Sequence, residues 1–335
     1  TRCVVVALFA WAGTAAAAHW ANPELLVSAD KLKKGMEEGC PGHEGCKWVA
    51  VDCRDLKDYA AGHIPGAISF GKRCKKALRD ATSRVFVKTS KYENLFGKVG
   101  ISNDTHVVFY YDGLGTLTDA TTGFWIMEYL GHDKAHVLNG GIDAWRKAGN
   151  RLDNKPVKLK EATFKANVMP ARYSDTDEVV AIAEGKKPDT QLIDSRTAKE
   201  HSGKDIRALR GGRIPNTKLN ASHLDTLPKE KSKKTGKMET IAYLDADAAA
   251  KAFGDLDKNR RVVTHCQTGT RSTMTYLQLR ALGFKDPANW DDSWRIYGST
   301  LDYPVEDEQW YNFAGVNKKI KKLEKKVAEL EKAKK

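Results

Sequence analysis

The stretch that decides the fold reads VVTHCQTGTRS over residues 262–272, and TMTYLQLRALG follows it up to Gly283. Val262 and Val263 are apolar and β-branched, as at the end of a buried strand, whereas the residues before Gly283 favour a helix that a glycine ends. Cys266 therefore opens a short loop between a strand and a helix. A cysteine at a helix N-terminus can have its pKa lowered from about 8.5 to between about 3.5 and 7.5, which favours the reactive thiolate.

The backbone that follows this cysteine predicts an anion site. Successive N–H groups of a short loop can surround one anionic atom, and the dipole of the following helix adds to their effect. A plain buried cysteine is the alternative, but it would need neither Gly269 nor Arg271 at these positions. The loop is therefore expected to hold a thiolate together with any anionic group that the sulfur attacks or acquires.

Two segments of the chain look like copies of one another, which predicts a repeat. The first copy has WVAVDCR at 48–54 and GHIPGA at 62–67, and the second has QLIDSR at 191–196 and GRIPNT at 212–217. In both copies a later helical segment ends at Leu-Gly. Short apolar strands that alternate with helical segments predict an α/β fold, in which each copy forms a parallel sheet with helices on both faces.

These motifs resemble those of rhodanese domains, the sulfurtransferases that carry a sulfane sulfur as a cysteine persulfide. Cys-x-x-Gly-x-Arg lies between a strand and a helix, and a strand ending in Asp-x-Arg precedes the Gly-His-Ile-Pro-Gly-Ala turn. The resemblance covers nearly all of residues 24–305 and implies a tandem rhodanese. It implies a rhodanese-like domain at 19–149 and a catalytic rhodanese domain at 171–315. Residues 150–170 lose the periodicity and carry two prolines, which predicts a linker between the domains.

The two copies differ at the positions that carry the chemistry. Asp112 stands where the second copy has Cys266, and Leu117 stands where it has Arg271. A carboxylate cannot hold a persulfide. The first domain is therefore expected to be catalytically inactive and to form one wall of the cleft.

The resemblance also implies roles for the residues of the second copy. Cys266 would attack the outer sulfur of a small anionic donor, such as thiosulfate or 3-mercaptopyruvate, and later pass it to a thiol or cyanide acceptor. It implies neither a cofactor nor a metal. The loop that binds the substrate and the persulfide would consist of Gln267, Thr268, Gly269, Thr270, Arg271 and Ser272.

Several of these roles stay open at this point. Asp194 and Arg196 match the Asp-x-Arg motif and would orient the loop, contact the donor or form a structural ion pair. Arg271 would either bind the anionic group of the donor with its planar fork or tie the loop down from outside. Gln267 and Thr268 match neither the cationic residues of thiosulfate-preferring relatives nor the Gly-Ser of mercaptopyruvate-preferring ones, so the donor is unassigned.

Two other classes of function compete with sulfur transfer. Phosphatase-like and arsenate-reductase-like enzymes hold an oxyanion with His-Cys-x5-Arg, and this chain has one residue fewer between Cys266 and Arg271. The shorter loop favours sulfur over the larger phosphate or arsenate. A non-catalytic exported sulfur-binding module would keep the fold without needing Cys266. His265 should point to the opposite side of its strand and is expected to be a core histidine.

The two ends of the chain are interpreted separately from the domains. Residues 1–18 are largely apolar and end in small residues, which predicts a secretory signal peptide. Residues 316–335 contain nine Lys and three Glu, with apolar residues spaced 4, 3, 4, 3, and predict an amphipathic helical tail. The mature protein is expected in the periplasm or outside the cell, without stable membrane insertion.

Four cysteines cluster in the first domain, at positions 40, 46, 53 and 74. In an exported protein this cluster predicts at least one disulfide, with Cys40 and Cys46 the easiest pair to join. A zinc site is the alternative, but the spacings contain no Cys-x-x-Cys pair.

The net charge of +13 could suggest a nucleic-acid partner. However, the tail carries much of this charge, and the remainder is spread along the chain without a basic face that also bears aromatic residues. The charge therefore predicts a weak attraction for anionic substrates and no nucleic-acid binding.

Overall fold

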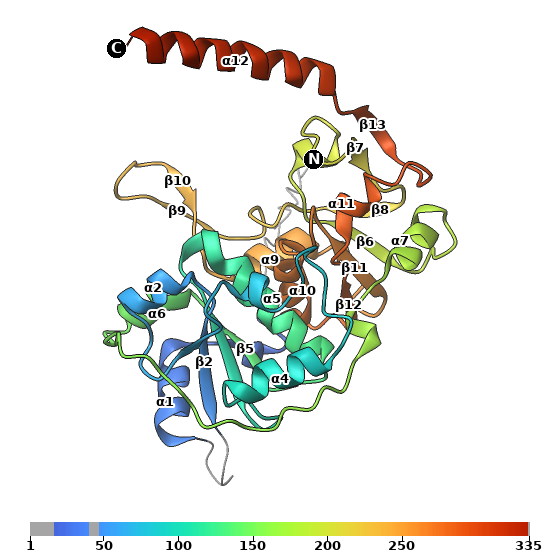
Figure 1. The fold of residues 1–335 in the computed structure, drawn as a ribbon. Coiled ribbons are helices and arrows are strands. Elements are labelled where there is room, and N and C mark those ends of the chain that lie inside the picture. Colours follow the sequence, from blue (N-terminus) through green and yellow to red (C-terminus); the bar gives the residue numbers. More distant parts are fainter. Residues whose placement is uncertain (1–16, 40–46, 334–335) are drawn as a thin grey trace, which may run out of the picture.

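The computed structural model describes residues 17–39 and 47–333, which form two α/β domains that lie side by side (Figure 1). The predicted signal peptide falls almost entirely outside these residues, as do Cys40 and Cys46.

The first domain contains a five-stranded sheet in the order β1-β5-β4-β2-β3, and all its pairs are parallel. Its strands are β1 (Leu26–Val27), β2 (Trp48–Asp52), β3 (Ile68–Ser69), β4 (His106–Tyr110) and β5 (Ala135–Leu138). Its helices are α1 (Ala29–Glu38), α2 (Leu56–Ala61), α3 (Cys74–Ala77), α4 (Ser90–Lys98), α5 (Gly113–Tyr129) and α6 (Gly141–Lys147).

The second domain contains a four-stranded parallel sheet in the order β12-β11-β6-β8. Its strands are β6 (Gln191–Asp194), β8 (Thr217–Asn220), β11 (Arg261–His265) and β12 (Asp286–Asn289). Its helices are α7 (Thr176–Ala183), α8 (Ala198–His201), α9 (Ala246–Phe253), α10 (Ser272–Ala281) and α11 (Ser293–Tyr297). The predicted fold class is confirmed, because each copy forms its own parallel sheet.

The repeat extends to the register of the strands. In the second domain His265 at the end of β11 pairs with Asp194 at the end of β6. In the first domain Tyr110 at the end of β4 pairs with Asp52 at the end of β2. Because carboxyl ends of neighbouring parallel strands meet at one edge, the Asp-x-Arg motif and the loop that follows the central strand come together in both copies.

Two small antiparallel pairs lie outside the parallel sheets and were not predicted. One joins β9 (Lys229–Lys231) to β10 (Met238–Thr240), and the other joins β7 (Arg210–Arg213) to β13 (Glu306–Trp310). These strands are short and carry mainly polar or glycine residues, so they show little of the apolar alternation that identifies a strand.

The helices α5 and α10 hold the two domains together. Tyr276 and Leu277 of α10 belong to the same buried cluster as Phe124 of α5. Beside this cluster Arg280 donates to both carboxylate oxygens of Glu128 at 2.8–3.1 Å. Each of these helices begins at the loop that follows the central strand of its domain, so both loops lie at the domain interface.

The C-terminal helix α12 (Phe313–Ala333) projects away from both domains (Figure 1). None of the described residues of this helix is buried. Its apolar residues Ile320, Leu323, Val327 and Leu330 are 46–62% exposed. In the described part of the chain, no helix has the length and apolar character needed to cross a membrane.

Candidate active site

The site is built around Cys266, which follows β11 directly and is fully buried. It is the free cysteine among the described residues. Its N–H donates to Ser293 Oγ at 3.1 Å, and its carbonyl accepts from the N–H of Trp294 at 3.0 Å. Ser293 itself has a φ of 53°, a left-handed conformation that is costly for a residue with a side chain. The start of α11 therefore holds the backbone of the cysteine from one side.

Gly269 allows the loop to approach the backbone at Asp291 closely. Its φ is 68°, and a Cβ at this position would lie 2.2 Å from Cα of Asp291. Any other residue would push the loop away from Asp291. The sequence analysis expected a glycine here because glycine, which has no Cβ, adopts a positive φ and allows close approach of the backbone.

The loop favours the thiolate of Cys266. Burial alone would raise the pKa of the thiol, but the charge of Arg271 and hydrogen bonds from Thr268 and Ser272 outweigh it, so the pKa lies below its ordinary value. An anionic sulfur is therefore stabilised by the loop that surrounds it.

Arg271 is held by a buried carboxylate. Its Nη1 and Nη2 donate to the two carboxylate oxygens of Glu200, each at 2.7 Å. Glu200 is 1% exposed and also forms a capping box with Thr197 at the start of α8. Burial would raise the pKa of Glu200, but Arg271 lowers it to about 2. Arg271 thus braces the loop while its charge acts on Cys266, a pairing that the sequence analysis did not find.

The Asp-x-Arg motif forms a structural ion pair. Arg196 donates from Nε and Nη2 to Asp194 at 2.7–3.1 Å, and from Nη2 to the carbonyl of Gly212 at 2.8 Å. Both side chains are at most 1% exposed, and the guanidinium lies 4.2 Å from the ring centroid of Trp294. Of the predicted roles, the ion pair is the one that the structure shows. This pair joins the strand end to the turn at 212.

His265 is a buried core histidine, as predicted. Its side chain is fully buried, and burial lowers its pKa to about 4. Its ring packs against Trp290 with the centroids 6.0 Å apart. Nε2 of the neutral imidazole lies 3.8 Å from Oδ1 of Asp194.

The corresponding loop of the first domain begins at Asp112. The Asp112 carboxylate is 44% exposed and lies 3.8 Å from Nη1 of Arg54. Arg54 and Asp52 form the same buried pair as in the second domain, and Arg54 also donates to Gly62. The two copies thus share the strand ends and the buried Asp–Arg pair. They differ in the first side chain after the central strand and in the backbone that follows it, because α5 begins at Gly113 whereas α10 begins only at Ser272.

The sequence analysis missed Arg79, which reaches the loop from the first domain. Its Nη1 donates to the carbonyl of Thr268 at 2.9 Å, and its Nη2 donates to the hydroxyl of Thr270. The side chain is 3% exposed. Only an unusually basic run over residues 72–79, where five of eight residues are Lys or Arg, could have drawn attention to this segment.

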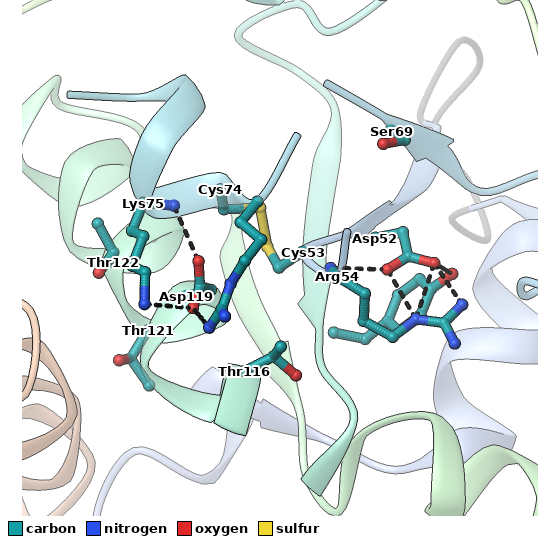
Figure 2. Close-up of a disulfide and its surroundings, with 12 residues drawn as sticks. Asp52, Cys53, Arg54, Ser69, Cys74, Lys75, Thr116, Asp119, Thr121 and Thr122 are labelled. Carbon is teal, nitrogen blue, oxygen red and sulfur yellow. Dashed lines mark hydrogen bonds and ion pairs between the residues drawn. A yellow bond between two sulfur atoms is a disulfide. The ribbon is translucent and has the colours of Figure 1, made fainter. Parts of the chain in front are cut away.

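A disulfide joins Cys53, just after β2, to Cys74 at the start of α3 (Figure 2). At least one disulfide in the cysteine cluster was predicted, and this pair confirms it. A zinc site made from all four cysteines is wrong, because two of them are joined to each other. Among the described residues, no group of three or more His, Cys, Asp or Glu side chains could hold a metal.

The fold and the site together define a two-domain α/β protein in which only the second copy of the active-site loop presents a thiol. The model of the rhodanese-like domain matches residues 28–148 and again residues 175–298. The chain therefore belongs to the rhodanese family.

Several known proteins resemble the chain over most of its length. A putative thiosulfate sulfurtransferase of Mycobacterium leprae is 31% identical over 85% of this chain and 99% of its own. The thiosulfate sulfurtransferase of Corynebacterium glutamicum is 31% identical over 86% of this chain and 92% of its own. A sulfur carrier protein of Thermus thermophilus is 28% identical over 85% of this chain and 98% of its own.

Among solved structures, the anaerobic ergothioneine biosynthesis enzyme of Chlorobium limicola has a similar fold. The TM-score is 0.69 at 22% identity, and the match covers 86% of this chain and 71% of that one. At this identity the likeness concerns the fold alone.

Proposed function

We propose that the protein is a sulfurtransferase that moves a sulfane sulfur from a small anionic donor to a thiol or cyanide through a persulfide on Cys266. The observation that carries this proposal is the position of Cys266, a free thiol with a lowered pKa in a loop of N–H donors. Relatives named thiosulfate sulfurtransferase at about 30% identity support it.

The reaction proceeds in two balanced steps. The Cys266 thiolate attacks the outer sulfur of thiosulfate, the sulfur–sulfur bond of the donor breaks, and its electron pair leaves with sulfite. With 3-mercaptopyruvate the carbon–sulfur bond breaks instead, and pyruvate leaves after taking up a proton. An acceptor thiolate or cyanide then attacks the outer sulfur of the persulfide and returns Cys266 to the thiolate. The loop N–H groups stabilise the negative charge in both states.

The two domains have different parts in this proposal. The second domain supplies Cys266 and its loop, whereas the first supplies Asp112 at the equivalent position and forms the opposite wall. The Cys53–Cys74 disulfide supports a location in an oxidising compartment, such as the periplasm or the outside of the cell.

The decisive experiment is the intact mass of the protein after incubation with thiosulfate or with 3-mercaptopyruvate. We expect the mass to increase by one sulfur atom and to return to its first value when cyanide is added. Cys266→Ser should show no increase, and Asp112→Ala should behave as the wild type. A wild-type protein that takes up no sulfur from either donor would favour a non-catalytic module, and release of phosphate from an aryl phosphate would favour the phosphatase class.

A further inference from the structure

A pocket of about 600 Å³ lies between the two domains, on the side of the active-site loop that faces the first domain. Its lining is strongly basic and includes Lys72, Lys75, Lys76 and Arg79 of the first domain and Thr268 and Arg271 of the loop. Asp80 is the acidic residue of this lining. Cys266 itself is fully buried, but residues of its loop line this pocket. An anion bound in the pocket would therefore lie next to the loop that surrounds Cys266.

Arg79 differs from the other buried arginines near the loop. Arg196 and Arg271 each donate to a buried carboxylate. The Nη groups of Arg79 donate to the carbonyls of Ser83 and Thr268 and to a hydroxyl, and its Nε has no partner among the described residues. Within the described ranges 17–39 and 47–333, no carboxylate lies within ion-pair distance of it.

A buried charge whose hydrogen-bond partners are all neutral is costly unless an anion approaches it. Burial lowers the pKa of Arg79, and the negative charges of Asp291 and of the Cys266 thiolate oppose this effect. The thiolate is part of the site itself, so the charge of Arg79 belongs to the electrostatics of the loop. A bound donor would bring further negative charge to the same place.

The first domain holds Arg79 in position from both sides. The Cys53–Cys74 disulfide fixes the start of α3, and Lys75 donates its N–H to Asp119 of α5 at 3.3 Å (Figure 2). After Arg79, the N–H of Val85 donates to the carboxylate of Asp291 at 2.7 Å. The segment is thus attached to its own domain at one end and to the second domain at the other.

We propose that this pocket binds the sulfonate or carboxylate group of the sulfur donor, and that Arg79 supplies from the first domain the cation that the loop lacks at Gln267 and Thr268. The inference rests on the proposed function. Lys72 and Lys76, which form no ion pair within the described part of the chain, attract the donor at the pocket rim. The catalytically silent domain is therefore part of the donor site.

The test compares Arg79→Met and Arg79→Lys with a matched control, Arg146→Met. Arg146 is an exposed arginine of the same domain on α6, paired with Asp143 outside the pocket. For Arg79→Met we expect kcat/KM for thiosulfate to fall by about 10- to 100-fold, since one charged hydrogen-bond donor is lost. Arg79→Lys should lose less because it keeps the charge, and Arg146→Met should stay within about twofold.

A second measurement does not depend on sulfur transfer. Sulfate, an unreactive dianion, should slow alkylation of Cys266 by iodoacetamide in the wild type. Arg79→Met should need at least about tenfold more sulfate for the same protection. If Arg79→Met does not fold, as its melting curve would show, the double variant Lys72→Met/Lys76→Met must still weaken protection by severalfold.

The outcomes separate this inference from the proposed function. A wild-type protein that transfers sulfur, with Arg79→Met unchanged in kcat/KM and in sulfate protection, overturns the inference and leaves the function intact. Sulfate protection that requires Arg79, in a protein that takes up no sulfur, supports the anion site and overturns the function.

Discussion

At the scale of single residues, the electrostatics of the site depend on which buried charged side chains form ion pairs. Arg271 and Glu200 neutralise each other through two hydrogen bonds of 2.7 Å. The two hydrogen bonds fix the guanidinium of Arg271 in a position where its charge acts on Cys266. Removing one partner of such a buried pair is more harmful than removing an exposed charge. Glu200 also accepts from Nη1 of Arg207 at 3.1 Å, so it keeps a second cation when Arg271 is changed.

The pKa of Cys266 provides the first prediction. Arg271 is the strongest influence that lowers this pKa against the effect of burial, so Arg271→Met should raise it. The pH midpoint of iodoacetamide alkylation should lie below the ordinary value of about 8.5 in the wild type and move upward in the variant. Arg271→Lys keeps the charge and should move it less. An unchanged midpoint in Arg271→Met would show that the loop N–H groups alone stabilise the thiolate.

At the scale of elements, the same strands and helix occur twice with the same pairing of strand ends. Asp112 is followed directly by α5, whereas residues 267–271 separate Cys266 from α10, so the copies differ in the segment between strand and helix. The short helix α3 has no counterpart in this comparison. A helix of four residues is not stable by itself, and the start of α3 is fixed by the Cys53–Cys74 disulfide and by Asp119 of α5.

The disulfide at α3 provides a second prediction. Cys53 and Cys74 are 21 residues apart, and closing a loop of this length stabilises the folded state by about 3 kcal/mol through the entropy of the unfolded chain. Cys53→Ala/Cys74→Ala should lower the free energy of urea unfolding by roughly that amount. A reducing agent should do the same to the wild type. The double variant is the control for this disulfide. Because Cys40 and Cys46 remain in it, the test is that a reductant lowers its free energy of unfolding less than it lowers that of the wild type.

At the scale of the whole molecule, the packing of α5 against α10 brings the two loops to one interface. This packing also brings Arg79 to Thr268, a residue 189 positions away in the chain. The tail helix takes no part in this arrangement, since none of its described residues is buried. The pocket therefore depends on both domains and on the way they are packed together.

The buried histidines provide a prediction for the stability of the molecule. Burial lowers the pKa to about 4 in His132, His136 and His265, and partial burial lowers the pKa of His223 to about 4 as well. Between pH 6.5 and 4 the unfolded chain therefore binds more protons than the folded one, and stability falls as the pH decreases. At pH 5.5 each histidine should cost about 1 kcal/mol relative to pH 7.5.

One carboxyl group opposes this trend. Burial raises the pKa of Asp291 to about 6, so its contribution to stability increases as the pH falls, but by less than the sum for the histidines. Urea unfolding at pH 7.5 and 5.5 is the measurement. His136→Gln should reduce the difference between the two, and the exposed His19→Gln should not. Equal free energies of unfolding at the two pH values would contradict the prediction.

The sequence by itself determined the two α/β copies, the loop that Cys266 opens and the need for glycine at position 269. These features depend on residues close in the chain, because strand and helix periodicity and the geometry of a tight loop are local. It also singled out Asp112 as the residue that stands where the second copy has Cys266, since the copies could be compared position by position.

Only the tertiary structure decided which partners those residues meet. The role of Arg271 was left open until Glu200 of another element was found against it, and the Cys53–Cys74 pairing was one of several possible. Arg79 could not be connected to the loop, because the contact crosses the domain interface and has no motif. Such contacts depend on how the apolar faces of α5 and α10 pack. This packing brings together charged residues that are far apart in the chain, and their spacing in the sequence does not predict the contact.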